Sequence, residues 1–352
     1  MARYDERDIM FARMEYKPGS KEYEDYYGRH PELKEQDDAM RAMPNILGEG
    51  TATYNPLMGP VSEAGFGMLG EMRKYVDNKP NAVKVETDPE DITRKIKNIT
   101  QYFGAKLVGI CKMEPEHYYS YRGRDGAYGE TVDPQYPYGI VFAVEMDRDM
   151  INRAPQMEEM ITVVKGYVDG AVAGMWLSYY IGELGYNARN NMDGSFTVIA
   201  PKVAEDAGLG EIGRNGLLIT KKYGQRVRLG IVTTDLPLIP DSKEMFGVKE
   251  LCQICGKCAQ TCPGKAISKE DMVDIDGTKG WRIKQEDCYI TWRRIGTDCG
   301  VCLSTCPLSQ DIPESLVEDM KYSELARLKI LEYYKEHYGI RPYIKKPLKI
   351  ME

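Results

Sequence analysis

Eight of the nine cysteines of this 352-residue chain lie between residues 252 and 306. They form two runs, C-x2-C-x2-C-x3-C-P and C-x10-C-x2-C-x3-C-P. Thiolates at this spacing bind cuboidal iron–sulfur clusters, and where two clusters share a module the last cysteine of each run binds the other cluster. The sequence therefore predicts two [4Fe–4S] clusters. Their ligands are Cys252, Cys255, Cys258 and Cys306 for one, and Cys288, Cys299, Cys302 and Cys262 for the other.

Eight cysteines have two other common uses. Four disulfides are typical of a small secreted domain, and zinc sites take four ligands that usually come in two pairs. The length of the chain and the C-x2-C-x2-C-x3-C-P spacing favour clusters over both. The ninth cysteine, Cys111, lies in the apolar run AKLVGICKM, and we expect it to be buried and free.

The composition is typical of a globular protein, with 42% hydrophobic and 29% charged residues. A formal charge of −7 argues against nucleic-acid binding by bulk electrostatics. Apolar runs fall short of the roughly 20 residues of a membrane span, and the charged start shows no signal-peptide or paired-arginine pattern. We expect no nucleic-acid partner, no transmembrane segment and a cytoplasmic location, although a processed exported form would look the same.

The pattern divides the chain into four parts. Residues 1–87, rich in Tyr, Met, Gly and Pro, predict an irregular segment that wraps over another domain or covers a pocket. Residues 88–245 form the core and residues 246–312 the cluster module. Residues 313–352 form a charged helical tail around SELARLKILEYYKEH.

Within the core, periodicity and caps predict an alternation of helices and strands. We expect helices over 88–104 and 156–185, and strands over 105–113, 138–146, 195–200 and 226–235. Such an order indicates an α/β or α+β core. The loop between the first two strands has a length that is usually kept for function.

A glycine motif in the core matches G-x-G-x-x-G at Gly208, Gly210 and Gly213. As a dinucleotide fingerprint it should directly follow a strand and open a helix. Here it follows the polar run VAEDA, which disfavours a nicotinamide site. We expect instead a loop whose bare backbone lets a large flat ligand approach.

Together these motifs resemble the corrinoid-dependent reductive dehalogenases. DERDIMFARMEYKPGSKEYEDYYGRHPELKEQDD is similar to their opening signature, and AEDAGLGEIGRNGLLITKKYGQRVRLGIVTTDLPL to their corrinoid-binding stretch. The double cysteine run, with its long gap between Cys288 and Cys299, is also similar, so the resemblance covers most of residues 5–312. The related epoxyqueuosine reductases, which modify tRNA, share the central and cysteine-rich parts.

The resemblance implies a nitroreductase-like core that binds base-off cobalamin, with a C-terminal two-cluster ferredoxin module delivering electrons to cobalt. It implies a small halogenated organic substrate and an external low-potential donor such as ferredoxin or flavodoxin. Corrinoid-binding positions would be Gly208, Leu209, Gly210, Gly213, Thr234 and Asp235. Two alternatives stay open: a tRNA-modifying enzyme like the epoxyqueuosine reductases, and a non-catalytic corrinoid or electron-transfer protein. The chain is shorter than most family members, lacks the twin-arginine leader, and differs after Cys306.

Reductive removal of a halide needs two electrons and one proton, and the family takes the proton from a tyrosine assisted by a cation. Tyr167, on the long helix, is the candidate acid. A guanidinium stabilises the tyrosinate left behind, and Arg226 is the first candidate and Arg228 the second, both on one face of an extended strand. Asn191, after the helix, is a further candidate for holding the tyrosine or substrate. Each also has a structural interpretation: core tyrosine, strand-end charge or turn residue.

Overall fold

A four-stranded antiparallel sheet forms the centre of the chain in the computed structural model, which describes residues 3–275 and 277–351. The strand order is β1-β2-β6-β3. The strands are β1 (Leu107–Lys112), β2 (Tyr138–Glu145), β6 (Val227–Thr234) and β3 (Ala188–Asn191). The middle parts of both central strands, residues 139–144 and 229–232, are continuous apolar runs because helices cover both faces of the sheet.

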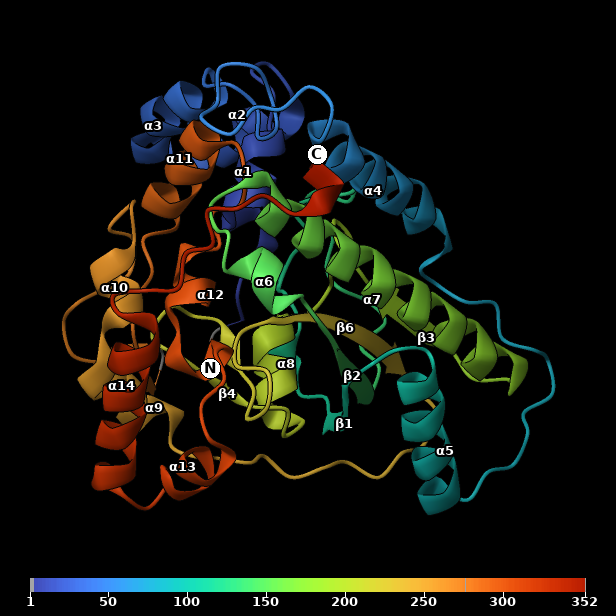
Figure 1. The fold of residues 1–352 in the computed structure, drawn as a ribbon. Coiled ribbons are helices and arrows are strands. Elements are labelled where there is room, and N and C mark those ends of the chain that lie inside the picture. Colours follow the sequence, from blue (N-terminus) through green and yellow to red (C-terminus); the bar gives the residue numbers. More distant parts are fainter. Residues whose placement is uncertain (1–2, 276, 352) are drawn as a thin grey trace.

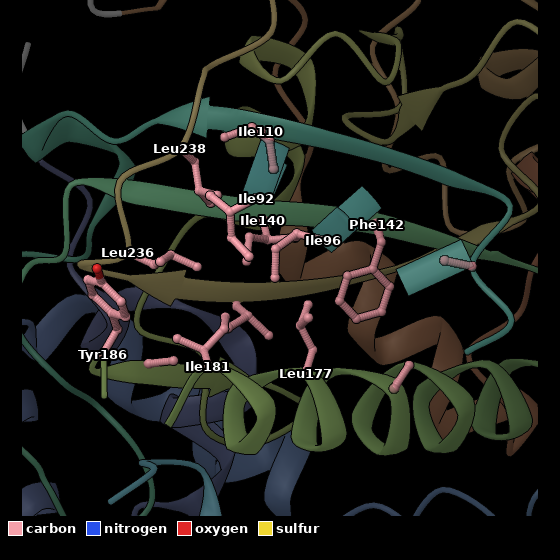
Figure 2. Packing of buried hydrophobic residues seen from close by; sticks show 14 residues of the cluster. Ile92, Ile96, Ile110, Ile140, Phe142, Leu177, Ile181, Tyr186, Leu236 and Leu238 are labelled. Carbon is pink, nitrogen blue, oxygen red and sulfur yellow. The ribbon is translucent and has the colours of Figure 1, made fainter. Parts of the chain in front are cut away.

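Alternate residues of β2 enter two different cores. Ile140 and Phe142 face α5 (Pro89–Tyr102) and α7 (Met157–Glu183), and Figure 2 shows Leu177 and Ile181 of α7 pointing toward them. Val141 and Ala143 face α8 (Ala200–Asp206) on the opposite side. The two faces follow directly from the period of two in a strand, and the layered α/β architecture agrees with the prediction.

The predicted helices at 88–104 and 156–185 are present with small boundary shifts. Asp88 caps α5 by accepting a hydrogen bond from the Asp91 amide (2.9 Å). The strand predicted over 195–200 was wrong, since that segment has only an isolated bridge between Tyr118 and Val198 before α8 begins. The fourth strand is β3, earlier in the chain, where Asn191 pairs with Ile231.

The prediction that residues 1–87 are irregular was also wrong. This segment contains α1 (Met10–Glu15), α2 (Lys21–Arg29), α3 (Pro31–Arg41) and α4 (Gly59–Met72). Its first three helices pack buried tyrosines against one another, next to a buried ion pair between Arg13 and Asp37 (2.6 Å). No periodic pattern in the sequence indicates this packing. Arg13 also reaches Glu286 of the cysteine module (2.5 Å), and Figure 1 shows these blue helices beside the orange α11.

The cysteine module and tail lie on one side of the core (Figure 1). The module comprises α9 (Val248–Cys255), α10 (Lys257–Thr261), β7 (Val273–Ile275), β8 (Thr278–Gly280), α11 (Gln285–Ile295), α12 (Val301–Thr305) and the 3₁₀ turn η4 (Pro307–Ser309). The tail forms α13 (Glu314–Asp319) and α14 (Glu324–Tyr338). No helix in the described ranges is long and apolar enough to cross a membrane.

Short elements connect these parts, among them three 3₁₀ turns, η1 (Glu6–Asp8), η2 (Arg73–Tyr75) and η5 (Lys349–Met351), and four others. The four others are the short helix α6 (Arg148–Ile151), the 3₁₀ turn η3 (Pro115–His117) and the two-residue strands β4 (Glu211–Ile212) and β5 (Leu218–Ile219). Strands β4 and β5 pair with each other at the glycine motif. Cys111, in β1, is buried and free as predicted.

Candidate active site and cluster module

A cavity of about 590 Å³ opens between the N-terminal helices, α7, the segment before α8 and the cysteine module. Most of its walls are apolar. The apolar lining comprises Ile9, Phe11, Ile46, Leu47, Phe66, Met160, Val163, Phe196, Val198, Ile199, Ala200, Pro201 and Trp292. The polar lining comprises Glu63, Tyr119, Arg124, Tyr167, Asp193 and Asp298. A few polar groups in an apolar hollow are the usual composition of a small-molecule site.

Tyr167 and Arg228 meet at the wall of this cavity. The guanidinium carbon of Arg228 lies 4.7 Å from the centroid of the Tyr167 ring, a cation–π distance. Arg228 comes from β6 and reaches across α7 because Gly166 has no side chain. A Cβ at Gly166 would come within 2.7 Å of the Arg228 stem.

Asp298 holds the other end of Arg228. The Arg228 Nη2 donates to Asp298 Oδ2 over 3.0 Å, and Asp298 directly precedes Cys299 in the chain. Glu159 of α7, completely buried, lies beside this pair and against Gly300, where its carboxylate occupies the space of a Cβ. A continuous array therefore runs from Tyr167 through Arg228 and Asp298 to the loop that carries Cys299.

The charges of this array act on the phenol in opposite directions. Arg228 lowers the pKa of Tyr167, but burial and the carboxylates Asp193 and Asp298 outweigh it and leave that pKa above its usual value. Burial and the neighbouring Asp298 also raise the pKa of the Glu159 carboxyl well above its usual range. Tyr167 is therefore a protonated acid at neutral pH.

Arg226 lies apart from Tyr167, contrary to the prediction that it is the first partner. Its Nε donates to the Ser309 carbonyl (2.8 Å), and its Nη1 bonds Glu145 and the Met146 carbonyl (both 3.0 Å). The residue directly precedes β6, and its carbonyl accepts from the Met146 amide (2.9 Å). Arg226 joins the core to the end of the cysteine module, and Arg228 takes the position against the phenol.

Asn191 is not in a turn but in β3, where it is 1% exposed. Its Oδ1 accepts from the Thr197 amide (2.9 Å) and the Thr197 hydroxyl (2.7 Å). Its Nδ2 donates to Thr233 and Arg189. With both ends of the amide engaged, Asn191 shapes the loop that carries Asp193 and Phe196 and contacts neither Tyr167 nor the cavity.

The predicted corrinoid positions are only partly brought together. Gly208, Leu209 and Gly210 line a separate hollow of about 390 Å³ on the side of β1. Thr234 and Asp235 bond Asn187, which ties the end of β6 to β3. Of the predicted set, Gly213 alone lines a cavity that adjoins the candidate site.

The glycine motif instead holds the cysteine module against the core. Glu211 Oε1 accepts three backbone N–H bonds at the start of α9, from Phe246 (2.5 Å), Gly247 (2.8 Å) and Val248 (3.2 Å). Arg214 donates to the Cys252 carbonyl (3.1 Å). Opposite charges thus lie at opposite ends of α9, each at the end that the helix dipole favours. A Cβ on Gly213 would lie 2.6 Å from Ile219 Cδ1, so this glycine permits the close approach of Ile219 in β5.

Some of the thiols that the crossed assignment pairs lie near one another, while Cys258 lies near Cys302 as well as Cys252 and Cys306. Burial and then the neighbouring Cys252 and Cys255 raise the pKa of the Cys306 thiol. Burial and then Cys262 raise the pKa of Cys288 to about 11. All nine cysteines are free of disulfides. Among residues 3–275 and 277–351 the thiols do not converge as a single-ion site, and in a cluster each cysteine binds its own iron.

Comparison with known proteins agrees with this geometry. A family model described as a 4Fe-4S dicluster domain matches residues 251–309. A tetrachloroethene reductive dehalogenase of Desulfitobacterium hafniense is 35% identical over 214 residues, covering 58% of this chain and 36% of that protein. One of Sulfurospirillum multivorans is 30% identical over 259 residues, covering 64% of this chain and 51% of that protein. The chain is a homologue of the reductive dehalogenases.

Solved structures extend the likeness to the whole fold of this dehalogenase homologue. The catabolic reductive dehalogenase NpRdhA, in complex with 3-bromo-4-hydroxybenzoic acid, has a TM-score of 0.77 at 23% identity, covering 97% of this chain and 47% of that one.

The sequence is also similar to the tRNA-modifying relatives. An epoxyqueuosine reductase of Lactococcus garvieae is 26% identical over 145 residues, covering 40% of this chain and 39% of that protein. The chain spans between about a third and a half of the length of the curated dehalogenases named above.

A second cavity of about 430 Å³ adjoins the candidate site of the dehalogenase homologue, and the two share Ile199 and Pro201 in their linings. Its walls come from α8, the glycine motif and the β7–β8 hairpin, with polar side chains such as Lys202, Glu205 and Lys243. The first cavity contains Tyr167, and the second adds several charged side chains to a largely apolar lining and borders the motif that contacts Cys252. Such charged side chains are suited to the polar periphery of a large ligand.

Several site residues of the dehalogenase homologue escaped sequence reasoning: Glu159, Asp298, Arg124 and Asp193. Arg124 lies in the long loop between β1 and β2 whose length signalled function. Asp298 carried one local signal, its place next to Cys299. No sequence signal indicated a role for Glu159, because acidic residues are common in the first turn of a helix, where Glu159 lies in α7.

Replacing either crossed cysteine tests the ligand groups of the dehalogenase homologue. In the ferredoxin arrangement Cys306→Ser removes a ligand from the cluster of the first run, and Cys262→Ser removes one from the cluster of the second run. Each variant is expected to bind roughly half the iron of the parent chain after anaerobic reconstitution, measured by iron and sulfide analysis. Cys111→Ser serves as the control and should keep the full content. Both variants losing the same cluster, by their EPR spectra, would contradict the crossed assignment.

Proposed function

We propose that this chain catalyses reductive dehalogenation of a small organohalide, R–X + 2e⁻ + H⁺ → R–H + X⁻. One observation carries the proposal. Tyr167, a protonated phenol paired with Arg228, lines an apolar cavity, and Asp298 connects that pair to the cysteine module. The cavity thus has an acid and a cation at one wall and an electron source behind it.

The residues of the chain have separate tasks in this reaction. The apolar walls exclude water, which strengthens the electrostatic interactions inside the cavity. Tyr167 donates its phenolic proton to the carbon that loses the halide. Arg228 lies 4.7 Å from the ring centroid and stabilises the tyrosinate that remains. The two [4Fe–4S] clusters, held by the crossed cysteines, pass the two electrons one at a time.

Base-off cobalamin is the cofactor that we propose for the two joined cavities. When bound, a corrinoid supplies a low-valent cobalt centre that takes up the electrons and breaks the carbon–halogen bond. Ile199 and Pro201 lie where the cavities meet, and Lys202, Glu205 and Lys243 offer polar contacts to the amide-bearing periphery of such a ring. None of the three histidines lines either cavity.

The apolar walls favour a neutral substrate, and the similar proteins of Desulfitobacterium and Sulfurospirillum are named for tetrachloroethene. We infer a small chlorinated alkene. The electrons would come from an external low-potential donor such as ferredoxin or flavodoxin. A cytoplasmic location belongs to the same proposal.

The test is anaerobic reconstitution with iron, sulfide and cobalamin, followed by halide release from tetrachloroethene with reduced viologen as donor. We expect cobalamin to remain bound through gel filtration and chloride to be released in proportion to protein. Cobalamin binding without halide release would favour the non-catalytic corrinoid protein, and activity on epoxyqueuosine-containing tRNA would favour the tRNA-modifying alternative. Absence of bound cobalamin would overturn the proposal.

A further inference from the structure

Tyr334, in the tail helix α14, has a buried hydroxyl with no evident structural or catalytic role. Its side chain is 0% exposed, and its hydroxyl has no hydrogen-bond partner among the described residues. A buried hydroxyl without a partner destabilises the folded state, so such a group calls for an explanation. The sequence did not single out this residue, and the proposed dehalogenation does not use it.

The surroundings of Tyr334 belong to one of the two cysteine groups. Ile330, one turn earlier in α14, packs in a buried cluster with Leu251, Cys306 and Leu308. Lys257, which lies between Cys255 and Cys258 in the chain, places its Nζ 4.6 Å from the centroid of the Tyr334 ring. Figure 1 shows α14 in red alongside α9 and α10.

Thiols of the same group lie near the phenol. Cys306 and Cys255 are close enough to Tyr334 to act on it electrostatically. A phenol keeps its proton in the neutral range and is a hydrogen-bond donor. Sulfurs of the cluster that Cys252, Cys255, Cys258 and Cys306 would bind would be the nearest acceptors for this hydroxyl.

We propose that the Tyr334 hydroxyl donates a hydrogen bond to a sulfur of this cluster and thereby raises the reduction potential of the cluster. Reduction adds one negative charge, and a donor to sulfur stabilises the reduced state more than the oxidised state. Lys257 acts in the same direction through its positive charge. The inference rests on the cluster ligands and not on dehalogenation, so it stands or falls independently of the substrate.

The proposed hydrogen bond gives the C-terminal helix α14 a role in tuning a cluster. The other group, with Cys299 and Cys302, adjoins Glu159 and Asp298 beside the candidate active site. The group under α14 would be the cluster whose potential the Tyr334 hydroxyl raises, so this cluster would be easier to reduce than it would be without that hydroxyl.

Tyr334→Phe removes only the hydroxyl, and Tyr333→Phe, on the same helix, is the matched control. We expect EPR-monitored redox titration of the reconstituted two-cluster protein to show one midpoint potential shifted to a more negative value in Tyr334→Phe. The second midpoint should stay in place, and both midpoints should be unchanged in Tyr333→Phe. Unchanged midpoints in Tyr334→Phe, or an equal shift in the control, would overturn the proposal.

A second variant covers the case in which Tyr334→Phe fails to load its cluster. Site-specific incorporation of 3-fluorotyrosine at position 334 keeps the size of the ring and makes the hydroxyl a stronger donor. The same midpoint should then move to a more positive value. Absence of any shift, or a shift in the negative direction, would show that the hydroxyl does not act on the cluster.

Discussion

Tyr167→Phe is expected to lower the rate of halide release by about 10²–10⁴-fold, the usual contribution of a positioned general acid. The phenol lines the cavity, and no hydrogen bond to its oxygen ties it to the described protein, so phenylalanine fills the same space. Cobalamin binding, cluster content and thermal stability should remain at the level of the parent chain. The measurement is chloride release per bound cobalamin with reduced viologen.

The control for this prediction is Tyr180→Phe, on the same helix but in the core away from the cavity. Its rate should match that of the parent chain. Because the pKa of Tyr167 lies above the usual value of a phenol, its proton is present throughout the neutral range, and the parent rate should not fall as pH rises from 7 to 9 for lack of this acid. Full activity in Tyr167→Phe would show that another group donates the proton.

The parts of the fold that sequence reasoning predicted are those determined by local patterns. The helix of residues 157–183 has an apolar stripe long enough to be unambiguous, and the runs 139–144 and 229–232 are apolar because both sheet faces are covered. The cysteine spacing by itself predicts iron–sulfur binding. These signals depend on neighbours in sequence and not on the tertiary fold.

The parts that were missed depend on distant partners. The helices at 10–41 bury tyrosines around Arg13 and Asp37 and show no apolar stripe of aliphatic residues. Arg226 and Arg228 are two residues apart, but Ser309, Glu145 and Met146 bind the Arg226 side chain and only Arg228 lies against Tyr167.

The same limit applies to Asp298 and Glu159. The sequence places Asp298 beside a cysteine and Glu159 in the first turn of a helix, where each reads as an ordinary surface carboxylate. Tertiary packing brings both against Arg228, which comes from a different element more than 60 positions away from either residue. Buried charge networks of this kind arise from the fold and leave no periodic trace.

Arg228→Gln is the second variant with a large expected effect, and it should act on stability as well as on rate. It removes the cation beside the phenol, and it leaves Asp298, with its side chain 14% exposed, without its ion-pair partner. Breaking a largely buried pair on one side destabilises a protein by about 3–5 kcal/mol. We expect a lower midpoint of anaerobic thermal unfolding together with a loss of halide release of at least about 10²-fold.

The double variant Arg228→Gln/Asp298→Asn separates these two effects. Removing both charges together relieves the unpaired carboxylate, so part of the lost stability should return, while the rate should stay as low as in Arg228→Gln alone. Asp298→Asn by itself should lower kcat, because the carboxylate holds the Arg228 guanidinium beside the phenol. Asp298 could instead act through the adjacent Cys299. In that case its effect on kcat will add to the effect of Arg228→Gln, and a cluster potential will shift in Asp298→Asn and in the double variant. Non-additive effects on the rate, with unchanged cluster potentials, would show that Asp298 acts by holding the guanidinium over the phenol.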